Sequence, residues 1–183
     1  MKHARDAVGL VVAVFAASAW AETPAPKPDP EMKKLEMLVG HWTYQGEYKP
    51  GPVGPTGKFS GEVTYEMILG GFILQGRFLE KGVMGDLQSL ELCGYDPANK
   101  NYHVTVYSND GSHWTGAITV SGTTWSTSWK LAFGGKQYLI RATDNFSPDW
   151  TSFAQKGEIS TDGKAWATWW EMKVTKVKPA AQK

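Results

Sequence analysis

The segment KFSGEVTYEMIL, from Lys58 to Leu69, alternates apolar and polar side chains along its whole length. One face would carry Phe59, Val63, Tyr65, Met67 and Leu69. The other would carry Ser60, Glu62, Thr64 and Glu66. A period of two is typical of a half-buried β-strand with one apolar face and one wet face.

The same pattern recurs in about ten runs after Gly40. They begin near His41, Lys58, Gly71, Gln88, Asn101, Ser112, Thr123, Lys136, Asp149 and Ala165. The connections carry tight-turn residues, such as Gly134-Gly135 and Asp162-Gly163, which favour hairpins. Parallel strands would need long crossovers, for which the chain has no room, so the pattern predicts an antiparallel meander.

We therefore predict an all-β fold, a single antiparallel up-and-down barrel of about ten strands with a short N-terminal plug helix. Closure removes the unpaired edges that an open sheet would expose. A two-sheet sandwich is the alternative, but the even spacing offers no Greek-key crossover. Asp29 is a candidate helix cap before Pro30, and Gly40 would end the helix. The helix would dock through Met32, Leu35 and Leu38.

The chain divides by composition into four parts. Residues 1–21 combine a basic start, an apolar run and the small-x-small site Ala19-Trp20-Ala21, which predicts a secretory signal peptide. Residues 22–30 form a Pro-rich linker, residues 31–176 the barrel domain and residues 177–183 a disordered tail. We expect the protein to be periplasmic or secreted after cleavage at Ala21, with no membrane span.

The amino-acid composition limits the classes of molecule that the protein is expected to bind. The formal net charge of the 183-residue chain is +1 and no basic stripe is present, so nucleic acid is not an expected partner. Nine Trp and an aromatic share of 13% favour sheets and ligand-facing walls. The expected partner is an unidentified small hydrophobic molecule, bound without a cofactor by a monomer or homodimer.

Three motifs, taken in order, carry a family resemblance. They are LEMLVGHWTYQGEY (Leu35–Tyr48), MILGGFILQGRF (Met67–Phe78) and GYDPANKNYHVTVYSNDG (Gly94–Gly111). Together they resemble the DUF1579 family of exported bacterial proteins, which looks related to the calycin barrels: lipocalins, fatty-acid-binding proteins and nitrobindins. The resemblance implies a single up-and-down barrel and no settled activity. Val106 and Ser108 stand where the family's third motif usually has Trp and Asp, so no role of those residues is transferred.

Alternation predicts an interior of rings and aliphatic side chains, almost free of ionisable groups. The same alternation predicts that Leu90 and Leu92 also point inward. Such an interior favours binding over proton transfer, and argues against an enzyme without excluding one. The candidate ligand-binding residues are Trp42, Tyr44, Tyr65, Phe78, Tyr102, Trp114, Trp129, Tyr138 and Trp170. We predict no catalytic residue.

Two alternatives to a ligand cavity stay open: a haem-binding barrel of the nitrobindin kind and a filled structural or interaction barrel. Haem binding requires an inward axial ligand, but His41, His103 and His113 all fall on the outward phase. Too few ligands converge for a metal site, so none is predicted. The lone Cys93 is interpreted as a small residue within a strand. The loop Lys49–Lys58 is either a rim or lid of the barrel or a disordered hairpin tip.

Overall fold

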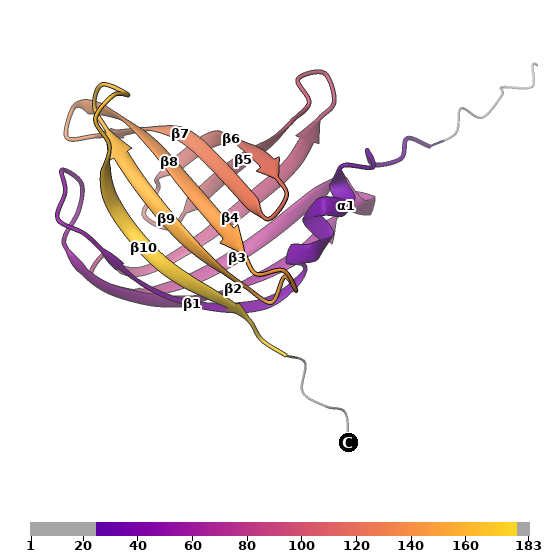
Figure 1. The fold of residues 1–183 in the computed structure, drawn as a ribbon, viewed down its shortest axis with the longest axis horizontal. Coiled ribbons are helices and arrows are strands. Elements are labelled where there is room, and N and C mark those ends of the chain that lie inside the picture. The colour runs from indigo at the N-terminus through magenta and orange to yellow at the C-terminus, as the bar shows by residue number, and fades with distance from the viewer. Residues whose placement is uncertain (1–24, 179–183) are drawn as a thin grey trace, which may run out of the picture.

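The computed structural model describes residues 25–178, and ten antiparallel strands close into one barrel (Figure 1). The signal peptide predicted for residues 1–21, the first residues of the linker and the end of the predicted tail lie outside this range. The strands are β1 (Gly40–Tyr48), β2 (Gly57–Ile68), β3 (Ile73–Gly82), β4 (Gly85–Asp96), β5 (Asn101–Ser108), β6 (His113–Ser121), β7 (Thr124–Phe133), β8 (Lys136–Phe146), β9 (Ser152–Ser160) and β10 (Ala167–Lys176). The predicted all-β barrel of ten strands is confirmed.

The first strand closes the barrel by pairing on both sides. Trp42 of β1 lies opposite Val63 of β2 and also opposite Lys176 of β10. Every other strand pairs with its neighbours in sequence, so the meander has no crossover and no free edge. The Greek-key sandwich is therefore excluded.

A short helical segment covers one end of the barrel (Figure 1). It consists of α1 (Met32–Leu35) and the 3₁₀ helix η1 (Glu36–Leu38). The predicted docking residues Met32, Leu35 and Leu38 are all buried, and the Asp29 carboxylate accepts a 2.9 Å hydrogen bond from the backbone N–H of Glu31. So short a helix gains its stability from this packing and not from its own hydrogen bonds. A second 3₁₀ turn, η2 (Leu69–Gly71), joins β2 to β3 at the same end.

The opposite end of the barrel carries the β1–β2 loop. Val53 in this loop is buried, and its carbonyl accepts a 3.2 Å hydrogen bond from the indole of Trp169 on β10. The Met84 side chain contacts Gly54 from the β3–β4 turn. The loop was predicted to be either a rim or lid of the barrel or a disordered hairpin tip, and in the structure it is an ordered rim.

No helix within residues 25–178 is long and apolar enough to cross a bilayer.

Candidate ligand cavity

The interior of the barrel contains a cavity of about 280 Å³ between the helical plug and the rim. Leu35 and Leu38 close it at the plug end, and side chains from all ten strands form its wall. The volume exceeds the ~150 Å³ of an engineered apolar cavity that holds benzene and approaches the lower limit, about 300 Å³, of ordinary ligand pockets. The aromatic side chains therefore leave interior space that could accommodate a small molecule.

Five of the nine candidate ligand-binding residues line this cavity. They are Tyr44, Tyr65, Phe78, Trp114 and Trp129. The Trp114 and Trp129 rings stack with centroids 4.3 Å apart, which makes a flat aromatic wall. Gly61 on β2 lies directly against the Tyr44 ring, so a side chain at that position would displace the ring.

Two of the remaining four candidates hold the helical plug. The buried Trp42 indole donates a 2.7 Å hydrogen bond to the Leu38 carbonyl, and its ring lies under the Lys176 ammonium, 5.1 Å from the nitrogen to the ring centroid. The Tyr102 hydroxyl donates to the Glu31 carbonyl at 2.9 Å, and lies 3.0 Å from a Glu31 carboxylate oxygen. These contacts lie outside the cavity lining and attach the plug to the barrel.

The other two, Trp170 and Tyr138, also lie outside the cavity lining. The Trp170 indole donates a 2.7 Å hydrogen bond to the side-chain oxygen of Gln155, and its ring lies directly over Gly157. The Tyr138 ring is buried near the rim, beside a shallow groove that Trp166 also lines. Trp170 still contributes indirectly, because Gln155 is itself part of the cavity wall.

The expectation of an interior almost free of ionisable groups is wrong. Glu80, Glu91 and Asp144 all line the cavity. The prediction that Leu90 and Leu92 point inward is also wrong. Strand β4 has the opposite phase, which turns Ser89, Glu91 and Cys93 inward. The polar half of the site is therefore absent from the residues predicted from the sequence.

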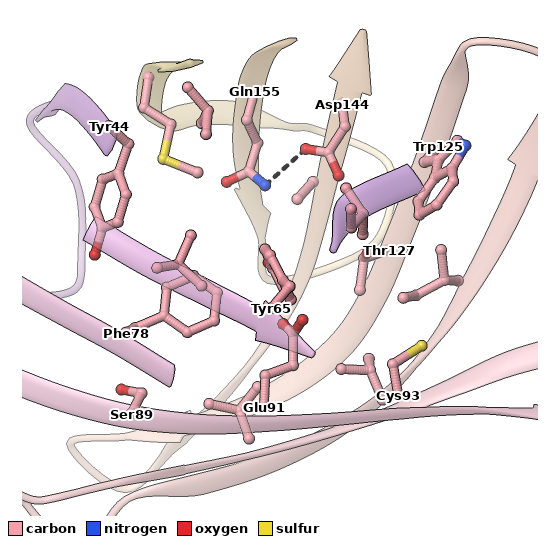
Figure 2. A pocket seen from close by; sticks show the side chains of 18 of the residues that line it. Tyr44, Tyr65, Phe78, Ser89, Glu91, Cys93, Trp125, Thr127, Asp144 and Gln155 are labelled. Carbon is pink, nitrogen blue, oxygen red and sulfur yellow. Dashed lines mark hydrogen bonds between the residues drawn. The ribbon is translucent and has the colours of Figure 1, made fainter. Parts of the chain in front are cut away.

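Glu91 and Asp144 come from opposite walls and point toward each other, with Tyr65 between them (Figure 2). Burial raises the pKa of Asp144 to about 7. Burial, followed by the nearby charge of Asp144, also raises the pKa of Glu91 to about 7, against a lowering by the Tyr65 hydroxyl. Burial therefore lets both carboxyl groups readily hold a proton near neutral pH.

A hydrogen-bonded chain fixes Asp144. The Gln155 side-chain amide donates to its carboxylate at 2.7 Å, the dashed line in Figure 2, and Trp170 in turn donates to the Gln155 oxygen. The amide thus has one orientation, with nitrogen toward Asp144 and oxygen toward Trp170. This chain explains how a tryptophan outside the cavity positions a carboxylate inside it.

The third carboxyl group belongs to Glu80, which lies next to Tyr48. The Tyr48 hydroxyl donates to it at 3.3 Å. Burial raises the pKa of Glu80, while its hydrogen bonds with Tyr48 and Tyr44 lower it. The tyrosine hydroxyls are held neutral, since burial and the adjacent carboxylates raise the pKa of both Tyr44 and Tyr48.

The histidines lie outside the cavity, as predicted. His41 lies 3.1 Å from the Thr64 hydroxyl and 3.4 Å from the Glu62 carboxylate on the outer face. His103 and His113 are exposed. Within residues 25–178, no three His, Cys, Asp or Glu side chains converge as a metal site. Cys93 is buried in the cavity wall, where burial raises the pKa of its thiol.

Comparison with known proteins supports the fold and leaves the activity open. A solved structure, the crystal structure of Rv2717c from M. tuberculosis, is similar with a TM-score of 0.59 over 83% of this chain and 100% of that chain, at 12% sequence identity. At this identity the likeness concerns the fold alone. No curated protein matches the sequence. The model of the DUF1579 family, proteins of unknown function, matches residues 27–172, and the chain therefore belongs to that family.

Proposed function

We propose that this protein is an exported, lipocalin-like barrel that binds a small, largely apolar or aromatic molecule in its central cavity and does not transform it. The observation that carries the proposal is the interior space of about 280 Å³, whose wall includes the stacked rings of Trp114 and Trp129. Export rests on the predicted signal peptide over residues 1–21.

The size of the cavity supports binding over a purely structural role. Protein interiors are ordinarily close-packed, and apolar side chains that line an unfilled space lose packing contacts, which costs stability. Larger side chains at Ala142 or Val104, which both line it, would remove that cost. A barrel that serves only as a structural element has no reason to keep the space.

Haem binding is less well supported. His41, His103 and His113 are on the outer face, so none of them is available as an axial ligand inside the cavity.

A second candidate function is proton transfer to or from the bound molecule. It is favoured by one observation, the pair of facing carboxyl groups whose pKa values lie near 7, where general acids and bases work well. Loss of chemical turnover in Glu91→Gln with retained binding would favour this candidate. Release of an unchanged ligand by the wild-type protein would favour simple binding.

The test is native mass spectrometry of the protein purified from its own host. We expect a mass above that of the processed chain, from which a small organic molecule is released on denaturation. Ala142→Phe fills the cavity and should abolish the extra mass, whereas Ala132→Phe, the same change at an exposed site on β7, should retain it. An unliganded wild-type barrel, together with identical behaviour of the two variants, would refute the proposal.

A further inference from the structure

The charges that line the cavity all have one sign. Glu80, Glu91 and Asp144 face it, and no Lys, Arg or His from residues 25–178 lines it. None of these three carboxylates forms an ion pair with a basic side chain in the described part of the chain. Buried carboxylates are ordinarily paired with a cation, and here a cationic partner is missing.

The two central carboxylates also have unused hydrogen-bonding capacity. An ionised carboxylate accepts about four hydrogen bonds. Asp144 has the Gln155 amide as its side-chain donor, and Glu91 has the Tyr65 hydroxyl beside it. Tyr65 is itself only 8% exposed and belongs to the cavity wall. The free lone pairs of both carboxylates therefore face the cavity, where a donor from a ligand could reach them.

We infer that the ligand is a small hydrophobic amine, bound as its cation with its nitrogen in the acidic part of the cavity, at Glu91 or Asp144, and its apolar part against Trp114 and Trp129. This inference rests on the proposed function and names the ligand class for the same cavity. An ammonium group supplies up to three N–H donors and a positive charge, which are the two things that the pair lacks.

The aromatic wall suits the same ligand. Rings attract an adjacent cation through their electron-rich faces, most strongly when both are shielded from water. Trp114 and Trp129 form one side of the cavity and Tyr44 and Phe78 another, with ring centroids of the latter pair 6.3 Å apart. A carboxylic acid such as a fatty acid would instead add a further negative charge to a buried space that already holds three carboxyl groups.

Proton exchange gives this ligand a characteristic pH dependence. The empty pair retains a proton near neutral pH, and a bound ammonium would replace it. Affinity for an amine should therefore increase from about pH 6 to about pH 8, while affinity for an uncharged analogue should not. The other titratable groups that line the cavity are Glu80, Tyr65, Tyr44, Tyr48 and Cys93. Burial raises the pKa of each of them, so none loses its proton more readily than in water.

The test compares three single-ring probes by isothermal titration calorimetry: 2-phenylethylamine, 2-phenylethanol and 3-phenylpropionate. At about pH 8 we expect the amine to bind at least about tenfold more tightly than the alcohol, because charge-assisted hydrogen bonds are about twice as strong as neutral ones. The carboxylate should bind most weakly. The double variant E91Q/D144N should lower the amine's affinity to that of the alcohol and remove its pH dependence. Glu171→Gln, the same change on the exposed face of β10, should leave both as in wild type.

Each other outcome overturns the inference. Equal or tighter binding of the alcohol would refute the amine preference and leave the proposed function standing. Amine binding that is unaffected in E91Q/D144N would show that the carboxyl pair does not hold the nitrogen. If no probe binds, the amine inference fails, and the proposed function is decided separately by the molecule that native mass spectrometry finds.

Discussion

The carboxyl pair inside the barrel predicts that the protein becomes less stable as pH rises from about 4 to about 7. Glu91 and Asp144 have pKa values of about 7 in the folded protein, against ordinary values of 4.5 and 3.8. Between the unfolded and folded pKa values, the folded state binds more protons, so the free energy of unfolding decreases with increasing pH. Below the unfolded values both states are protonated and the penalty vanishes; above the folded values it is complete and constant.

The size of the effect follows from the shifts. Each pKa unit corresponds to about 1.36 kcal/mol, so the displacement of Glu91 from 4.5 to about 7 costs about 3 kcal/mol once the group is ionised. Asp144 adds a cost of the same order, caused by its own burial. Since whole domains have stabilities of about 5–15 kcal/mol, the pair should dominate the pH profile of the unliganded barrel.

The assay is urea unfolding at about pH 5 and about pH 8, followed by tryptophan fluorescence. Wild type should unfold at a clearly lower urea concentration at the higher pH. E91Q/D144N should lose this dependence and be more stable than wild type at the higher pH, because it removes the buried charges and keeps the Gln155 contact to an oxygen at position 144. The control Glu171→Gln should follow wild type. A wild-type midpoint that is equal at both pH values, or a slope that survives in the double variant, would refute the reasoning.

Three further predictions follow from individual contacts. Gly157→Ala places a methyl group into the Trp170 ring and should cost about 1–3 kcal/mol of stability in urea unfolding. Gly51→Ala, whose methyl group would meet its neighbours only at ordinary van der Waals distance, should be neutral. Trp42→Phe removes the hydrogen bond to the Leu38 carbonyl and should lower the free energy of unfolding by about 1–3 kcal/mol. Amide hydrogen exchange of this variant should show faster opening of residues 32–38 than of the strands, and uniform exchange would contradict this. Cys93 should not react with a thiol reagent in the folded protein and should react fully in denaturant, because burial keeps its thiol protonated; rapid reaction of the native protein would contradict its burial.

The barrel was predictable because its signals are local and repeated. Period-two alternation predicted the positions of the strands, and tight-turn residues such as Gly134-Gly135 predicted the hairpins between them. Closure of the barrel then follows, because free strand edges are costly. The roles of Trp42 and Tyr102 were not predictable in the same way. Both face inward as expected, but which inward side chains meet the plug and which meet empty space depends on where the helix docks, and no sequence period encodes that.

Strand β4 shows where hydrophobic patterning fails. Its segment DLQSLELC offers two phases, and the inward assignment of Leu90 and Leu92 maximises the apolar surface buried. The structure takes the other phase. Leu90 pairs with Arg77 and Leu92 with Gln75 across the outer face of β3, where the two leucines remain half-buried. The phase is set instead by β4's register with its two neighbours, which places Cys93 opposite Leu74 and Val104, both buried.

The inward position of Asp144, in contrast, could have been predicted from the sequence. Tyr138 on β8 is one of the predicted inward residues, and the same period continues through Ile140 and Ala142 to Asp144 and Phe146. An acidic residue between two inward apolar positions costs stability wherever a neutral side chain would fit, so its presence is itself an indication of a site. Glu80 meets the same criterion, two residues after the inward Phe78 on β3. In a barrel of this kind the residues that break the alternation on its inward phase are therefore the better guide to function, because the rings that keep it are needed for folding whether or not anything binds.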